Sequence, residues 1–259
     1  MTEKDHKSPL LSHIQVTLDL QKKSFLVALL VFVFFALLSI IGQVYLPEIL
    51  KLSGVEIGGL PKPSMTSVFE NVWGNFILIG AILVIFQGST TFSSDLNVDK
   101  PMYILMSRPI SRDDYYLVIS VLKLVGILVV VFITSLMTYL ISDFFFDPIP
   151  MAVIIWGSLV QGLALASLLA IQISMNTRLS TGATAVWGII LLVSMTTLNI
   201  LATYLKYLKW FSPLALSSIS NEILFQHEYD HVLANSLVLL IWVIAPLLLG
   251  MYLFRKRDL

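Results

Sequence analysis

The chain has 259 residues, of which 57% are hydrophobic and 12% are charged, and its formal net charge is zero. Because a soluble domain usually carries about twice this share of charged residues, the composition favours an integral membrane protein. The neutral balance gives no basic surface for nucleic acid. The lack of cysteine excludes disulfides, thiolate metal sites and cysteine nucleophiles.

Six apolar stretches are each long enough to cross a bilayer as a helix. A helix rises ~1.5 Å per residue, so about 20 apolar residues cross a hydrocarbon core of roughly 30 Å. Lipid offers the backbone no hydrogen-bond partner, so such segments must be helical. The predicted spans are 24–46, 72–92, 115–141, 151–174, 182–201 and 234–254. We therefore predict an all-α integral membrane protein in which residues 1–259 form a single transmembrane domain.

Residues 8–23, ahead of the first span, have the pattern of an amphipathic helix that lies at the membrane surface. Leu11, Ile14 and Leu18 share one face of this helix, and polar residues occupy another. The alternative is an ordinary leader to the first span. That span is longer than the apolar region of a signal peptide and no cleavage site follows it, so we expect a retained anchor that ends at Pro47.

The segment 95–112, between the second and third spans, predicts a short helix followed by a rigid turn. Residues 103–106 begin with tyrosine and are otherwise apolar, and the sequence Ser-Arg-Pro-Ile-Ser-Arg follows them. Pro109 fixes the backbone of that turn, while Arg108 and Arg112 can pair with carboxylates or phosphates. Because a push on a short helix between two spans moves both spans, this segment can act as a lever.

Ionisable residues are nearly absent from the predicted spans. Lys123 lies within the third span, and we expect its side chain to reach back to the membrane interface. No acidic residue lies at mid-depth in any span. This argues against a proton-coupled transporter and a cation channel, and it suggests that energy reaches the bundle from outside.

The fourth span carries a small residue at every fourth position, which lets another helix backbone approach closely. These residues are Ser158, Gly162, Ala166, Ala170 and Ser174. The stripe can pack within one subunit or across a dimer, and we favour packing within one subunit. The short turn 176–181 predicts that the fourth and fifth spans pair as an antiparallel hairpin. The next segment, 202–233, is broken in two at Ser212-Pro213.

The sequence His227-Glu228-Tyr229-Asp230-His231, ahead of the last span, matches the zinc-protease pattern His-Glu-x-x-His. In that pattern two imidazoles on one helix face bind zinc and the glutamate is the general base. A catalytic zinc needs a third protein ligand, and no good candidate follows His231. We therefore interpret the motif as a solvated turn without metal. The alternative is a membrane zinc metallopeptidase, or a metal-binding membrane protein, that uses His227 and His231.

The distribution of basic residues predicts the orientation of the chain in the membrane. With the N-terminus in the cytoplasm, 11 lysines and arginines fall in cytoplasmic segments and 4 in external segments. Cytoplasmic loops of membrane proteins carry an excess of these residues. We therefore expect a multi-pass protein with both termini in the cytoplasm, which an even number of spans also requires.

Residues 104–112, Ile-Leu-Met-Ser-Arg-Pro-Ile-Ser-Arg, resemble an element of the ABC-2 type permeases, the six-span membrane subunits of ABC exporters. The likeness extends to the interfacial N-terminal helix, the six spans, the Ser212-Pro213 break and the basic residues 255–257. Within the family, the chain looks nearest to the NosY-like branch.

This resemblance implies that 95–112 is a cytoplasmic coupling helix that contacts a separate ATPase subunit. The implied contact residues are Tyr103, Leu105, Met106, Ser107, Arg108, Pro109 and Arg112. The chain has no Gly-x-x-x-x-Gly-Lys-Ser/Thr phosphate loop, so we expect it not to be an enzyme and to hold no cofactor, with ATP and Mg on the partner subunit. The implied working unit also contains a second permease copy or a paralogue, in the plasma (inner) membrane of a prokaryote.

Overall fold

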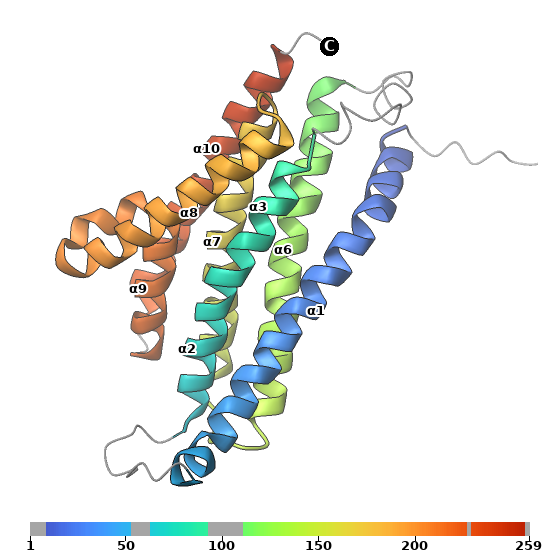
Figure 1. Cartoon of the computed structure of the whole chain (residues 1–259). Coiled ribbons are helices and arrows are strands. Elements are labelled where there is room, and N and C mark those ends of the chain that lie inside the picture. The colour runs from blue at the N-terminus through green and yellow to red at the C-terminus, as the bar shows by residue number, and fades with distance from the viewer. Residues whose placement is uncertain (1–8, 53–62, 93–110, 227–228, 257–259) are drawn as a thin grey trace, which may run out of the picture.

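The computed structural model describes residues 9–52, 63–92, 111–226 and 229–256 (Figure 1). Within these residues every element is a helix, and six helical stretches are long and apolar enough to cross a membrane. This confirms the prediction of an all-helical, multi-pass membrane protein.

The helical elements follow the chain in the order expected of alternating spans. They are α1 (Pro9–Leu52), α2 (Met65–Asn75), the π-helical η1 (Phe76–Gly80), α3 (Ala81–Ser89), α6 (Arg112–Ser142), α7 (Met151–Asn176), α8 (Thr181–Tyr204), the 3-10 helix η2 (Lys206–Phe211), α9 (Pro213–Phe225) and α10 (Tyr229–Arg255). Together α2, η1 and α3 form the second span. We call the end of the bundle that contains Arg255 the Arg255 end, and the opposite end, which contains Met151, the Met151 end. Helix α3 ends and helix α6 begins at the Arg255 end (Figure 1).

Helix α1 is longer than the predicted first span. It includes residues 9–23 of the predicted amphipathic segment and the whole predicted span in one helix, without a break at Ser24. It also continues past Pro47 to Leu52, so the prediction that it ends at Pro47 is wrong. Proline removes one hydrogen bond, to the carbonyl of Gln43, and the remaining backbone groups can still pair within the helix. That residues 8–23 lie along a membrane surface stays a prediction.

The second span begins earlier than the apolar pattern indicates, at Met65 rather than Val72. Ser64 caps this helix: the Ser67 amide donates to Ser64 Oγ at 3.2 Å, and the Ser64 amide donates to Ser67 Oγ at 3.1 Å. This reciprocal capping box satisfies backbone donors that a helix start leaves free. The first two turns place Glu70 on an exposed face, which is why they interrupt the apolar run.

Helix α7 lies at the centre of the bundle and packs against α3, α6, α9 and α10. The five small residues of its stripe are all buried within this chain, which confirms the interpretation that the stripe packs within one subunit. Close approach is visible at Gly157, where an added Cβ would lie 2.1 Å from a ring atom of Trp73. A larger side chain there would push the second span away from α7.

Helix α8 leans away from the rest of the bundle (Figure 1). It meets α7 near their connecting turn, where Gly188 lies against the amide of Gln172. At the same place Gly188 lies against Ile85 of α3, and α8 also packs against α9 and η2. The predicted hairpin of the fourth and fifth spans therefore holds only near the turn. The predicted break at Ser212-Pro213 is confirmed, because Ser212 caps α9 and Pro213 is its first residue.

Candidate functional site

Most residues of the predicted coupling contact lie outside the described residues: Tyr103, Leu105, Met106, Ser107, Arg108 and Pro109. Arg112 is described and is the first residue of α6. The structure does describe both points at which segment 93–110 joins the bundle, Phe92 and Ser111. The candidate site is the set of contacts that hold these two attachment points at the Arg255 end.

The first attachment point is held by an aromatic cluster formed by Phe92, Tyr115, Tyr116 and Phe254. The Phe92 ring stacks on Tyr116 with centroids 5.4 Å apart and lies 5.1 Å from Phe254. Phe92 is almost fully buried in these contacts. Aromatic pairs of this kind add packing energy beyond the area they bury. The end of the second span is therefore fixed to both α6 and α10.

Asn176, at the end of α7, fixes the same attachment point through hydrogen bonds. The Phe92 amide donates to Asn176 Oδ1 at 2.7 Å, and Asn176 Nδ2 donates to the Ser89 carbonyl at 2.6 Å. The same Nδ2 lies 3.4 Å from Thr184 Oγ1 on α8. A helix end leaves backbone groups without partners, and this buried amide supplies both a donor and an acceptor. Asn176 thus connects α3, α7 and α8.

Lys123 on α6 also stabilises the end of α3. Its Nζ donates to the Gln87 carbonyl at 2.7 Å and to Thr91 Oγ1 at 2.8 Å. A cation at a helix C-terminus pairs with carbonyl groups and with the negative end of the helix dipole. These contacts give its ammonium acceptors at the end of a neighbouring helix, and that Lys123 reaches the membrane interface stays a prediction.

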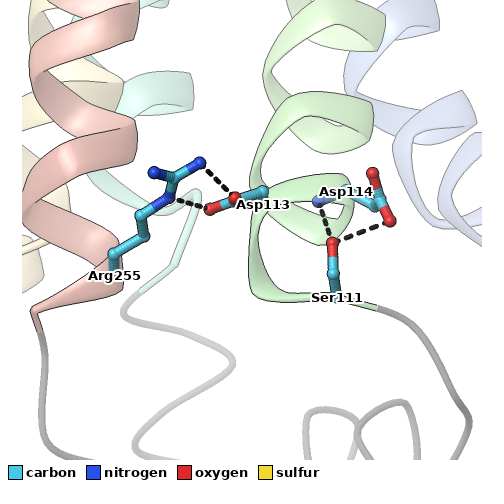
Figure 2. Close-up of polar contacts among 4 residues, drawn as sticks. All are labelled: Ser111, Asp113, Asp114 and Arg255. Atoms are coloured by element: carbon cyan, nitrogen blue, oxygen red, sulfur yellow. Dashed lines mark hydrogen bonds and ion pairs between the residues drawn. The ribbon is translucent and has the colours of Figure 1, made fainter.

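The second attachment point is the start of α6, shown in Figure 2. The Asp114 amide donates to Ser111 Oγ at 3.1 Å, and this hydroxyl donates to Asp114 Oδ2 at 2.7 Å. Asp113 forms an ion pair with Arg255, whose Nε donates to Asp113 Oδ1 at 2.6 Å. Both partners suit their helix ends, since Asp113 is in the first turn of α6 and Arg255 in the last turn of α10. The pair is exposed, so its contribution is weak and sensitive to salt.

The contacts around the two attachment points are packing, hydrogen-bond and ion-pair contacts between helices. The contacts around Phe92 and Ser111 reach α6, α7, α8 and α10. Over the described ranges, no three histidine or acidic residues lie close enough to hold a metal ion. His227 and Glu228 lie outside those ranges, and His231 is exposed on α10.

Sequence reasoning missed Phe92, Asn176 and the Asp113–Arg255 pair as site residues. Positions 92, 176 and 255 are far apart in the chain, so no local pattern links them. A local signal existed only for Ser111, a good N-cap residue followed three positions later by an acid.

A scan against models of protein families gives no match, and neither does a search of curated proteins.

Proposed function

We propose that this chain is the permease subunit of an ATP-driven exporter of the ABC-2 type. In this proposal a separate ATPase subunit binds ATP and Mg, contacts segment 95–112 and moves it. A second permease copy or a paralogue completes the translocation path. The Arg255 end is then cytoplasmic, as the distribution of basic residues predicts. The family resemblance implies the plasma membrane of a prokaryote.

The observation that supports this function best is the attachment of segment 93–110 to the bundle. A loop that only connected two spans would not need a buried amide and four packed rings at its first attachment point. Asn176 and the aromatic cluster make the loop mechanically continuous with α6, α7, α8 and α10. Displacement of the loop by a partner would therefore change the tilt of several spans at once.

The scarcity of ionisable residues in the predicted spans agrees with a source of energy for transport that lies outside the helix bundle. Lys123 is the ionisable side chain deepest in the predicted spans, and it is engaged by the end of α3. Proton relays require chains of ionisable groups, which the predicted spans lack. Work must then arrive through a surface, and the segment that carries Arg108 and Arg112 is the largest such surface predicted between spans on the cytoplasmic side.

Charge reversal in this segment tests the proposal. A desolvated pair of an arginine and a partner carboxylate contributes about a few kcal/mol of binding free energy at an interface. Leaving that carboxylate unpaired costs a similar amount. We expect Arg108→Glu with Arg112→Glu to reduce co-purification of the ATPase subunit, or to uncouple its hydrolysis from substrate in lipid. Leu105→Asp should act in the same direction.

The matched control is Lys22→Glu with Lys23→Glu, which makes the same change in charge on exposed residues of α1. Both double variants should give monodisperse protein on size-exclusion chromatography, which separates a lost contact from a folding defect. The proposal is contradicted if no ATPase co-purifies with the wild type. It is contradicted equally if the 108/112 variant keeps normal association and substrate-stimulated hydrolysis.

A further inference from the structure

An apolar groove lies where α8 diverges from α7 and α10. Its volume is about 790 Å³, within the range of small-molecule sites. Its walls include Ile171 of α7, Leu191 of α8 and Leu249 of α10. The walls are mostly hydrocarbon and stand among helices that we expect to cross the membrane, so the groove suits an acyl chain.

Two tryptophans of the groove wall are joined by a hydrogen bond. Trp242, midway along α10, donates from Nε1 to the carbonyl of Trp210 in η2 at 3.2 Å. Both side chains line the groove. The hydrogen bond holds η2 against α10. Val238 and Ile241, which precede Trp242 in α10, line the groove as well.

One end of the groove opens toward two exposed basic residues. Met175 lines the groove on α7, and Arg178 follows three residues later in the turn to α8. Lys256 directly follows the last residue of α10 and is seven residues beyond Leu249, which is close to two helical turns. The Lys256 ammonium lies 4.5 Å from the ring centre of Tyr252.

These two basic residues lie at the same end because α7 and α10 are in close contact there. A Cβ added at Gly250 would lie 2.9 Å from the Cα of Ser174. Arg178 follows Ser174 by four residues, and Lys256 follows Gly250 by six. The turn after α7 and the end of α10 therefore present positive charge beside the opening of the groove.

From this geometry we infer that the groove is a binding site for an anionic phospholipid. One acyl chain occupies the groove beside Trp210 and Trp242, and the phosphate lies beside Arg178 and Lys256. Anionic lipids are concentrated in the cytoplasmic leaflet, and each nearby basic residue raises affinity about fivefold. The Arg255 end is the predicted cytoplasmic end, so the charges lie at the leaflet that supplies the ligand. This site does not depend on the proposed transport function.

Quenching of tryptophan fluorescence by brominated acyl chains tests the site. Trp156→Phe with Trp187→Phe leaves the two groove tryptophans and Trp73, which is fully buried. This reporter chain is reconstituted in vesicles that contain phosphatidylcholine and phosphatidylglycerol in a fixed ratio. In one set the phosphatidylglycerol carries bromine, and in the other an equal mole fraction of phosphatidylcholine does. We expect brominated phosphatidylglycerol to quench the tryptophan fluorescence more than brominated phosphatidylcholine does. The affinity of the site for phosphatidylglycerol relative to phosphatidylcholine should exceed about fivefold.

Two pairs of variants separate the headgroup contact from the groove itself. Arg178→Gln with Lys256→Gln should nearly abolish the preference for phosphatidylglycerol over phosphatidylcholine, whereas Lys209→Gln should leave that preference unchanged. Lys209 is a matched control because it is a basic residue of η2, away from the Arg255 end, and its ammonium lies 4.8 Å from the centre of the Trp210 ring that lines the groove. Ala245→Phe narrows the groove and should reduce quenching, whereas the neighbouring Ile244→Phe should not.

Three results would overturn this assignment. Equal quenching by the two brominated lipids means that ordinary surrounding lipid fills the groove. A preference that survives in the Arg178→Gln, Lys256→Gln variant means that these residues do not bind the headgroup. Absence of quenching by either lipid, together with chemical crosslinks between copies at position 245, means that a second copy of the chain covers the groove.

Discussion

Helices α7 and α8 have nearly the same length and the same mean hydropathy in their most apolar stretches, yet they occupy opposite environments. In α7, 78% of the positions in that stretch are buried, against 17% in α8. Hydropathy therefore predicts that each helix crosses a membrane and does not predict which one forms the core. Lipid tails are as apolar as leucine side chains, so large apolar residues gain little by leaving lipid for protein.

The difference between the two helices lies in the size of their side chains. The α7 faces that meet other helices carry glycine, alanine and serine, which allow contacts such as Gly157 with Trp73. The exposed surface of α8 carries bulky residues such as Trp187, Val193 and Ile200. Because α8 has few close contacts, its tilt can change at lower cost than the tilt of α7. In the proposed transport cycle we expect α8 to move and α7 to serve as the fixed reference.

The largest effect should come from a cavity in α7. Leu165 is fully buried in α7, whereas Leu201 of α8 is 43% exposed. Leu165→Ala should lower the free energy of unfolding by about 2–5 kcal/mol, because the cavity removes packing contacts that lipid does not replace. Leu201→Ala should change it by less than about 0.5 kcal/mol. Unfolding in mixed micelles by titration with SDS measures both values. Similar losses for the two variants would remove the distinction between the helices.

A smaller effect should follow the loss of the Asn176 side chain. Asn176→Ala leaves the Phe92 amide and the Ser89 carbonyl without this partner, at a cost of about 1–3 kcal/mol. Hydrogen exchange should also increase at the end of α3, measured by mass spectrometry. Asn199→Ala, an amide of the same size on α8, is the control. An unchanged exchange rate at residues 89–92 would show that Asn176 does not hold the attachment point.

The smallest effect should appear where α8 meets α9. Ser212 Oγ accepts from the Ala215 amide at 3.3 Å and donates to the Met195 carbonyl at 3.2 Å, so it caps α9 and ties it to α8. Ser212→Ala should cost about 1 kcal/mol, the usual value of an N-cap. Ser194→Ala should be nearly neutral, since the Ser194 hydroxyl bonds only within its own helix. Equal stability of the two variants in the same SDS titration would count against the cap.

The sequence alone determined that this is a helical membrane protein with six spans, because lipid makes both the apolar length and the helical backbone local requirements. It also determined the break at Ser212-Pro213, since proline acts on its own turn. It did not determine helix ends that depend on capping or on tolerance of proline, such as Met65 and Leu52.

The tertiary structure decided which span is central and what each polar side chain contacts. Lys123 pairs with the end of α3, and Asn176 connects three helices, through contacts to residues more than 30 and more than 80 positions away in the chain. Both outcomes depend on distances between helices, which small residues such as those of the α7 stripe set. The groove between α7, α8 and α10 has the same origin, because bulky and small side chains of equal hydropathy differ in how closely they let helices approach.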